Sequence, residues 1–157
     1  MTAKYEVIEN QTLSTSVSSV TMTSIPGSYK DLFLIVGGTP GVSGASFRLT
    51  FNGDGGDNYG YCWMRKTGTG SGGETSGNTV ATARIQNYGV NGTGFVTADI
   101  FDYSATDKHK SVLMSLANVA QTTSRVAAKW ANTNAITSLT VTGNWPAGST
   151  FKLLGVN

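Results

Sequence analysis

Apolar and polar residues alternate with a period of two along much of this chain, and this alternation is its main structural signal. In residues 46–52 (SFRLTFN), Phe47, Leu49 and Phe51 occupy every second position, with Arg48 among the polar residues between them. Successive side chains of a strand point to opposite faces of a sheet. The run therefore predicts a strand with one buried face.

The following run shows the same alternation. In residues 58–66 (NYGYCWMRK), Tyr59, Tyr61 and Trp63 share one face. Only the residues GDGGD at 53–57 separate the two runs. Because glycine adopts positive φ angles without steric cost, we expect a tight turn here and predict that the two strands form a hairpin.

Further runs of similar composition lie between Gly, Pro, Asn and Ser clusters that favour turns. These runs are residues 4–9, 18–24, 31–37, 79–86, 94–103, 110–118, 124–132, 136–143 and 149–156. About eleven short strands without a sustained helical period predict an all-β protein, an antiparallel jelly-roll-like β-sandwich. The length of 157 residues fits a single domain, residues 1–157.

One segment has a different composition. Residues 66–79 (KTGTGSGGETSGNT) are rich in Gly, Ser and Thr and contain no large apolar residue. Such a segment is typical of an exposed, mobile loop. Two roles are open for it, a plain connector between strands or a surface loop that touches a neighbouring subunit or a ligand.

Composition excludes several classes of function. Charged residues make up 13% of the chain, against about 25% in an average soluble domain. The net charge is +2 and no basic cluster occurs, so we expect no nucleic-acid partner. A single cysteine, Cys62, excludes an intrachain disulfide and zinc sites built from several cysteines.

The sequence shows no membrane-spanning or secretion signal. The longest large apolar run, Leu32 to Val36, is too short to cross a bilayer, and the N-terminus lacks a signal-peptide pattern. We therefore expect no membrane partner and folding in a cytoplasm.

The glycine-rich turn carries oxygen ligands that raise the question of a metal site. Asn52, Asp54 and Asp57 alternate with glycines, as in a calcium loop. The EF-hand form also requires Gly at its sixth position and Glu at its twelfth, where this chain has Asp57 and Trp63. Because Asp and Asn are also ordinary turn formers, we interpret the segment as a structural turn and expect no metal. A weakly held cation or a polar ligand at Asp54 and Asp57 stays open.

No catalytic site is evident. His109 is the only histidine, with Asp107 and Ser111 two positions away on either side. At that spacing along a strand the side chains stand too far apart for a proton relay, so we interpret His109 as a solvated turn residue. The chain contains no phosphate-binding loop, nucleophile elbow or zinc-protease motif. We therefore expect no catalytic residues, no cofactor and no enzymatic activity.

The aromatic residues could fill a core or contact a partner. Trp63 and Trp130 lie in alternating runs and are expected in the core. Trp145 lies in the turn-like GNWPAGS and is expected to be a surface ring. Trp145 and Tyr88, together with the rim formed by Asp54 and Asp57, are therefore the candidate contacts for a partner protein or a glycan.

Several segments together resemble a widespread kind of small virion protein of tailed bacteriophages. The similar segments are residues 19–36, with the pattern Ile-Pro-x-x-Tyr-x-Asp-Leu, and residues 49–61, 102–112, 130–141 and 147–156. The last commonly ends Gly-Ser-x-Phe-x-Leu-Tyr-Gly-Ile, whereas this chain has Leu154 and Val156 in place of Tyr and Ile. These exchanges keep the apolar character.

The resemblance implies a jelly-roll β-sandwich that assembles as a homotrimer on the virion. Its first implied function is a capsid decoration (cement) protein on the outer head surface, assembled in the host cytoplasm, which bridges and stabilises subunits of the major capsid protein. The alternative is a trimeric tail-fibre or head-fibre adhesin that binds a host surface glycan. The resemblance implies no catalytic residues.

The N-terminal residues 1–12 are the candidate segment for contact with the shell or with a sister subunit. They include Lys4, Tyr5, Val7 and Ile8, whose composition suits a strand. Such a segment can bind by adding a strand to the exposed edge of a neighbouring sheet. We therefore expect a capsid-contact arm at this end of the chain.

Overall fold

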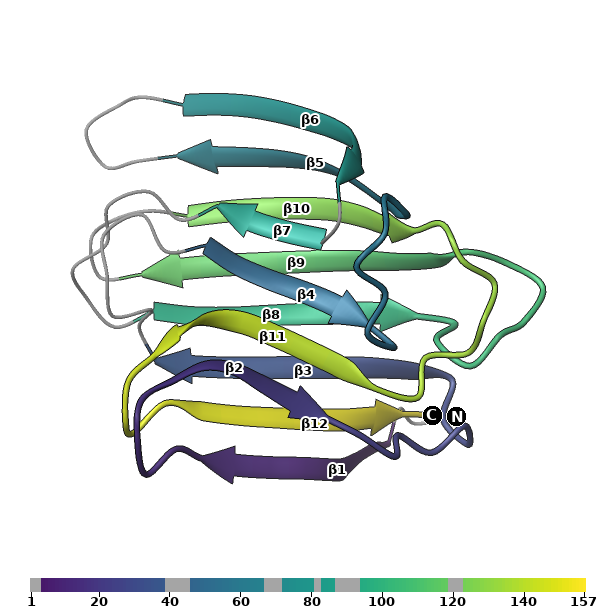
Figure 1. Cartoon of the computed structure of the whole chain (residues 1–157), viewed down its shortest axis with the longest axis horizontal. Coiled ribbons are helices and arrows are strands. Elements are labelled where there is room, and N and C mark those ends of the chain that lie inside the picture. Colours follow the sequence, from purple (N-terminus) through teal and green to yellow (C-terminus); the bar gives the residue numbers. More distant parts are fainter. Residues whose placement is uncertain (1–3, 39–45, 67–71, 81–82, 87–93, 119–122) are drawn as a thin grey trace.

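The computed structural model describes residues 4–38, 46–66, 72–80, 83–86, 94–118 and 123–157. In these residues the chain forms strands and turns, and two antiparallel sheets lie face to face (Figure 1). The eight-stranded sheet has the order β1 (Tyr5–Thr12), β12 (Thr150–Val156), β3 (Asp31–Gly38), β8 (Gly94–Phe101), β9 (Lys110–Asn118), β10 (Thr123–Trp130), β5 (Tyr59–Lys66) and β6 (Gly72–Val80). The four-stranded sheet has the order β2 (Val17–Met22), β11 (Leu139–Trp145), β4 (Ser46–Phe51) and β7 (Ala83–Gln86). The expected all-β, antiparallel jelly-roll-like β-sandwich is confirmed.

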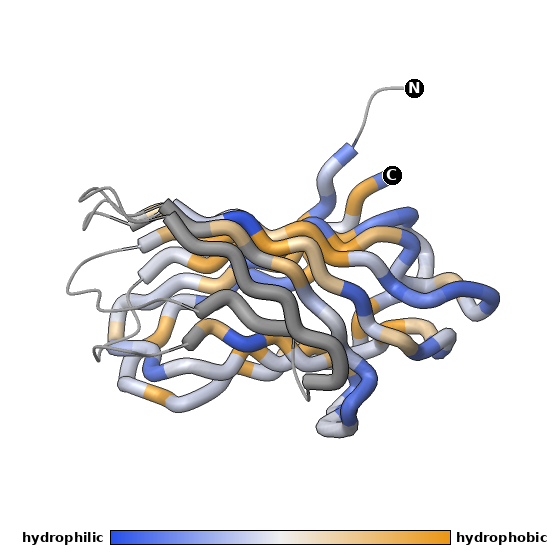
Figure 2. The backbone as a smooth tube through the Cα atoms, turned by 90° about the horizontal axis from the view of Figure 1, so that it is seen from above, coloured by the Kyte–Doolittle hydropathy of each residue, from blue (hydrophilic) through white to orange (hydrophobic). Residues whose placement is uncertain are grey.

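Alternating burial explains why these sequences form two layers. Along β10 every second residue is buried, ending with Val126, Ala128 and Trp130. In β4, Phe47, Leu49 and Phe51 are buried, as their spacing predicted. The buried side chains of both sheets form one hydrophobic cluster between the layers. Figure 2 shows the layers edge-on, with hydrophobic positions along the strands and hydrophilic ones at the turns.

The predicted hairpin between residues 46–52 and 58–66 is wrong. Strand β4 pairs with β11 and β7 in the small sheet, whereas β5 pairs with β10 and β6 in the large sheet. The intervening turn therefore carries the chain from one layer of the sandwich to the other. Turn residues specify how the backbone reverses locally, but they do not determine which strand becomes the hydrogen-bonded partner.

The expected loop at 66–79 is also wrong over its second half. Residues 72–80 form β6, which pairs with β5 at the edge of the large sheet. The strand expected at 79–86 is instead divided between the end of β6 and β7, which belong to different sheets. An edge strand forms its ladder through backbone groups, so it needs no apolar side chains to pair.

The N-terminal segment is built into the large sheet. Strand β1 pairs with β12 along its whole length, with an irregularity in register between Val7 and Glu9. The backbones of Lys4 and Asn157 exchange hydrogen bonds, so the start of the described chain lies beside its C-terminal residue. The strands that they flank, β1 and β12, are neighbours in Figure 1. The other side of β1 faces no strand of the described chain, because β1 ends the sheet order. Within the described residues no helix is suited to crossing a membrane.

Candidate functional site

The exposed large hydrophobic side chains of the described residues all belong to one face of the molecule. Between 37% and 60% of each is exposed, and they are Tyr5, Val7, Met64, Phe95, Phe101 and Leu113. All project from the side of the large sheet that faces away from the small sheet. We call this side the outer face. Large contiguous apolar surfaces on soluble proteins mark sites of interaction.

The strand registers establish this placement. In the pairing of β8 with β9, Ala98 lies opposite Met114 and both are fully buried. Because side chains alternate along a strand, the neighbouring residues Asp99 and Leu113, which also lie opposite each other, point outward. The same parity places Phe95 and Phe101 on the outer face.

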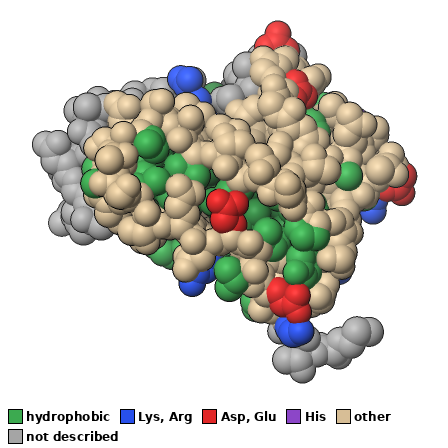
Figure 3. All heavy atoms as spheres, turned by 60° about the horizontal axis from the view of Figure 1, so that its bottom comes forward, with side chains coloured by type: hydrophobic (Ala, Val, Ile, Leu, Met, Phe, Trp, Pro, Cys, Tyr) green, Lys and Arg blue, Asp and Glu red, His purple; other side chains and the backbone are tan. Residues whose placement is uncertain are grey.

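A row of outward residues that runs across six strands of the outer face is almost wholly apolar. Each residue lies opposite the next on β1, β12, β3, β8, β9 and β10, and they are Val7, Leu154, Phe33, Asp99, Leu113 and Ala127. We call this set the outer row. Tyr5 packs edge-on against Phe33 with ring centroids 6.2 Å apart, which extends the apolar surface to the β1 edge. Figure 3 turns the β1 edge toward the reader, where hydrophobic atoms lie among polar ones, while the outer face itself points away from the viewer.

Asp99 is the one charged member of the outer row. Its opposite neighbours in the sheet are Phe33 and Leu113. Burial against them removes water and raises the pKa of the Asp99 carboxyl. The positive charge of Arg125 opposes this rise, and the negative charge of Asp31 adds to it. A carboxylate on an apolar face gains from a partner that supplies positive charge.

Positive charge lies two strands away on the same face. Ala127 of β10 is level with Asp99, through Leu113 of β9. The outward neighbours of Ala127 along β10 are Arg125 and Lys129, and both are exposed. The outer face therefore has an acidic position on β8 and a basic pair on β10, with β9 between them.

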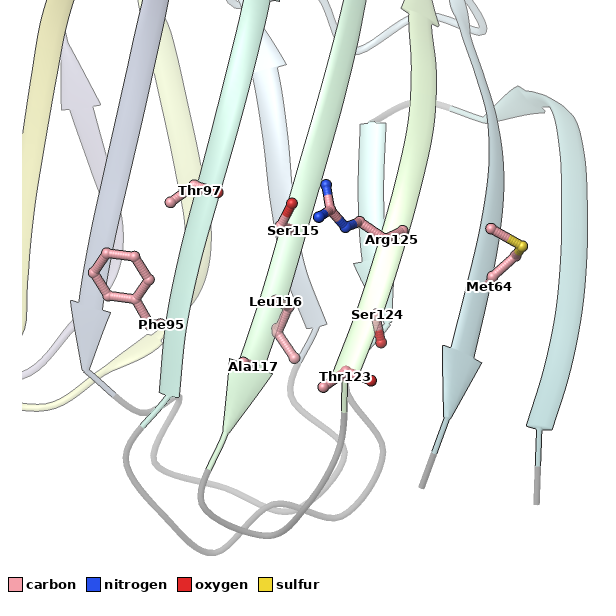
Figure 4. Close-up of a pocket in the computed structure, with 9 residues that line it drawn as sticks. All are labelled: Met64, Phe95, Thr97, Ser115, Leu116, Ala117, Thr123, Ser124 and Arg125. Atoms are coloured by element: carbon pink, nitrogen blue, oxygen red, sulfur yellow. The ribbon is translucent and has the colours of Figure 1, made fainter. Parts of the chain in front are cut away.

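A hollow of about 580 Å³ opens on the outer face beside the basic pair. Its lining residues come from β5, β8, β9 and β10, and they are Met64, Phe95, Thr97, Ser115, Leu116, Ala117, Thr123, Ser124 and Arg125. Figure 4 shows the Arg125 side chain directed toward Ser115, with Phe95 at the far side. The hollow combines an aromatic ring, hydroxyls and a guanidinium.

Asp54 in the glycine-rich turn has a structural role. Its Oδ1 accepts hydrogen bonds from the Gly56 backbone and Asn58, and its Oδ2 accepts from Asn58 and, at 2.7 Å, from Nε1 of the buried Trp130. The Trp130 hydrogen bond is the largest cause of a lowered Asp54 pKa, which the bonds from Gly56 and Asn58 reinforce against desolvation. Both oxygens face donors, an arrangement that favours a carboxylate anchor over a cation ligand.

Asn52 anchors the start of the same turn. Its φ angle is +52°, and the Asp54 N–H donates to the Phe51 carbonyl across the turn. The Asn52 side chain accepts from the Thr137 and Ser138 backbones and donates to the Ala135 carbonyl. The interpretation of this segment as a structural turn is confirmed. Among the described residues, no group of three or more His, Cys, Asp or Glu side chains could hold a metal ion.

The remaining sequence candidates do not converge on one site. The prediction that Trp145 is a surface ring is wrong, because only 1% of its side chain is exposed. The ring packs edge-on against Phe47 and Phe151, and this packing buries it between the sheets. Asp57 is exposed beside the turn. Tyr88 lies outside the described residues.

His109 is exposed in the connection before β9, as expected of a solvated turn residue. Sequence reasoning missed its neighbour Lys110, which is fully buried with Nζ donating to the Lys108 and Thr133 carbonyls. Burial lowers the pKa of Lys110, whereas the charges of Asp107 and Asp102 raise it. Sequence reasoning also missed the outer face, although Phe95, Phe101 and Leu113 occupied outward positions of two predicted strands.

The four candidate arm residues differ in exposure. Tyr5 and Val7 project from the outer face, while Ile8 packs partly against the core. Lys4 forms an ion pair with Glu6. Glu6 also accepts a hydrogen bond from the Tyr29 hydroxyl at 2.9 Å. The hydrogen bond from Lys4, followed by that from Tyr29, lowers the Glu6 pKa.

No family model matches the chain, and no curated protein matches it. Among solved structures, the chain is similar to the crystal structure of galectin LEC-6 from Caenorhabditis elegans, with a TM-score of 0.43 and 9% sequence identity. The alignment covers 94% of this chain and 95% of that chain. A likeness at this level supports no inference about function.

Proposed function

We propose that this chain is a structural protein of a bacteriophage virion, a capsid decoration protein that bridges and stabilises major capsid subunits on the outer head surface as a homotrimer. The role is one of binding, without catalysis. The resemblance of its sequence segments to phage virion proteins suggests the class. The observation that most supports an assembly role is the outer face, where all the exposed large hydrophobic side chains of the described residues gather.

The β1 edge is the proposed contact with the shell. It presents the exposed apolar side chains of Tyr5 and Val7 beside backbone groups that face no strand of the described chain. Such an edge can pair with an extended segment of another protein. Binding the assembled shell in this way stabilises it by mass action.

Reconstitution on heads tests this proposal. Purified protein is added to heads of its own phage that lack it, and bound copies are counted after sedimentation. We expect saturable binding that Tyr5→Ser combined with Val7→Lys abolishes. The matched control, Thr21→Lys, changes an exposed residue of β2 in the other sheet and should bind normally. Imaging that places the wild-type protein on the tail would contradict the decoration role.

A second candidate function is adhesion to a host surface glycan. The hollow favours it, because Phe95 offers a ring for a sugar face while Ser115 and Arg125 offer polar groups. The adhesin proposal predicts selective binding on a glycan array that Phe95→Ala removes. Absence of binding to any host glycan, together with many copies on each head, would eliminate this candidate.

A further inference from the structure

The centre of the outer face is complementary to itself. Asp99 of β8 and Ala127 of β10 lie at one level, on opposite sides of Leu113 of β9. Arg125 and Lys129 flank Ala127 on the same face. Acid and base are thus separated by two strand spacings, about 10 Å. A partner that carried the same face would offer each half its opposite charge.

A rotation axis parallel to β9 brings these opposite charges together in neighbouring copies. Rotation leaves the position of each residue along the axis unchanged, so Asp99 of one copy faces the position of Ala127 in the next copy. Strands in a sheet twist by roughly 20–25° from one to the next, so the positions of facing residues along the axis agree best for the strands beside the axis. Those strands are β8 and β10, which carry the acid and the bases.

We propose that further copies of this chain cover the centre of the outer face, from β8 to β10, arranged about a three-fold axis parallel to β9, with Asp99 of each copy lying between Arg125 and Lys129 of the next. The proposal rests on the homotrimer of the proposed function and assigns its interface. Strand β8 of each copy lies beside β10 of its neighbour, and Leu113 of β9 lies near the axis.

The outer row makes a second copy a better occupant than an unrelated surface. An unrelated partner would need one match for Asp99 and another for Arg125 and Lys129, whereas a second copy supplies both. Contact also covers Phe95, Phe101 and Leu113, which are exposed in the single chain.

Loss of water around Asp99 in the contact makes the contact selective for a partner in the correct register. Apolar contact around Asp99 removes further water from a carboxylate that already lies between Phe33 and Leu113. Arg125 of the same chain already opposes part of this cost. A partner that adds positive charge at that point offsets more of it, so a wrong register is penalised. The β1 edge stays at the rim of the face, where it is free to contact the shell.

The mass of the free protein in solution tests the proposal without heads. Light scattering after size exclusion should give three times the 16.4 kDa chain mass. Asp99→Lys, Arg125→Glu and Leu113→Glu should each lower the mass to that of a monomer at about 10 µM, because each leaves unpaired or like charges in the contact. Their circular dichroism should match the wild type.

Matched controls separate the interface from general surface charge. Arg48→Glu changes an exposed arginine on the small sheet, and Asp107→Lys changes an exposed turn aspartate; both should remain trimers. Asp99→Lys combined with Arg125→Glu and Lys129→Glu restores opposite charges and should recover the trimer. A wild-type monomer or dimer, or a trimer that all three single variants leave intact, would overturn the interface. Failure of an intact trimer to bind heads would instead count against decoration alone.

Discussion

At the scale of single residues, Asp54 anchors the turn by which the chain crosses between the two sheets. Its carboxylate holds Gly56, Asn58 and the indole N–H of Trp130 at once. Asp54→Ala leaves the Trp130 N–H without this acceptor, so we expect a loss of about 1–3 kcal/mol in unfolding free energy. Urea denaturation measures it. Asp57→Ala, an exposed change in the same turn, should cost less than about 0.5 kcal/mol, and equal losses would refute the anchor role.

The same carboxylate predicts a dependence on pH. Because the folded-state pKa of Asp54 is lowered, chiefly by Trp130, ionised Asp54 favours the folded state. Its contribution is fully present above the ordinary value of 3.8, and it disappears as the pH falls through the lower folded-state pKa. The stability gap between wild type and Asp54→Asn should therefore be constant near neutral pH and shrink below pH 3.8. Thermal unfolding of both proteins at pH 7 and pH 3 measures the gap, and a gap that widened in acid would contradict the assignment.

At the scale of elements, Trp145 ties the two sheets together. It belongs to β11 of the small sheet, and its ring packs on Phe151 of β12 in the large sheet with centroids 5.1 Å apart. Trp145→Ala should cost about 3–5 kcal/mol, as expected for a large buried ring. Trp145→Phe keeps an aromatic ring and removes a buried N–H that has no hydrogen-bond partner among the described residues, so it should cost much less. Urea denaturation of both variants compares the two costs, and similar values would argue against this packing role.

Strand positions were predictable because alternation is local, whereas pairing was not. The buried face of Phe47, Leu49 and Phe51 follows from spacing alone. The partner of β4 depends on contacts with β11, far along the chain, which no local pattern encodes. The prediction for Trp145 is wrong for a related reason, since a proline after it and a glycine on each side resemble a surface turn while the ring itself packs inward.

The candidate surface was harder to predict than the fold. Each exposed hydrophobic residue is unremarkable by itself in the sequence, and Phe95 and Leu113 come from different strands. Only the registers show that they share one face and that Asp99 lies level with Ala127. Residue type alone favours Trp145 and Tyr88 as contacts, and burial removes Trp145 from that set.

At the scale of the whole molecule, the proposed trimer makes folding stability depend on protein concentration. Three copies that cover one another's outer faces unfold to three separate chains, so the melting temperature of the wild type should rise by a few degrees over a hundredfold increase in concentration. Leu113→Glu prevents the contact but lies outside the core, so its melting temperature should be independent of concentration and equal to that of the folded monomer. Differential scanning calorimetry at several concentrations gives both curves. A wild-type melting temperature that did not depend on concentration would mean that the protein is a monomer with its outer face exposed to water, which would contradict the proposed trimer.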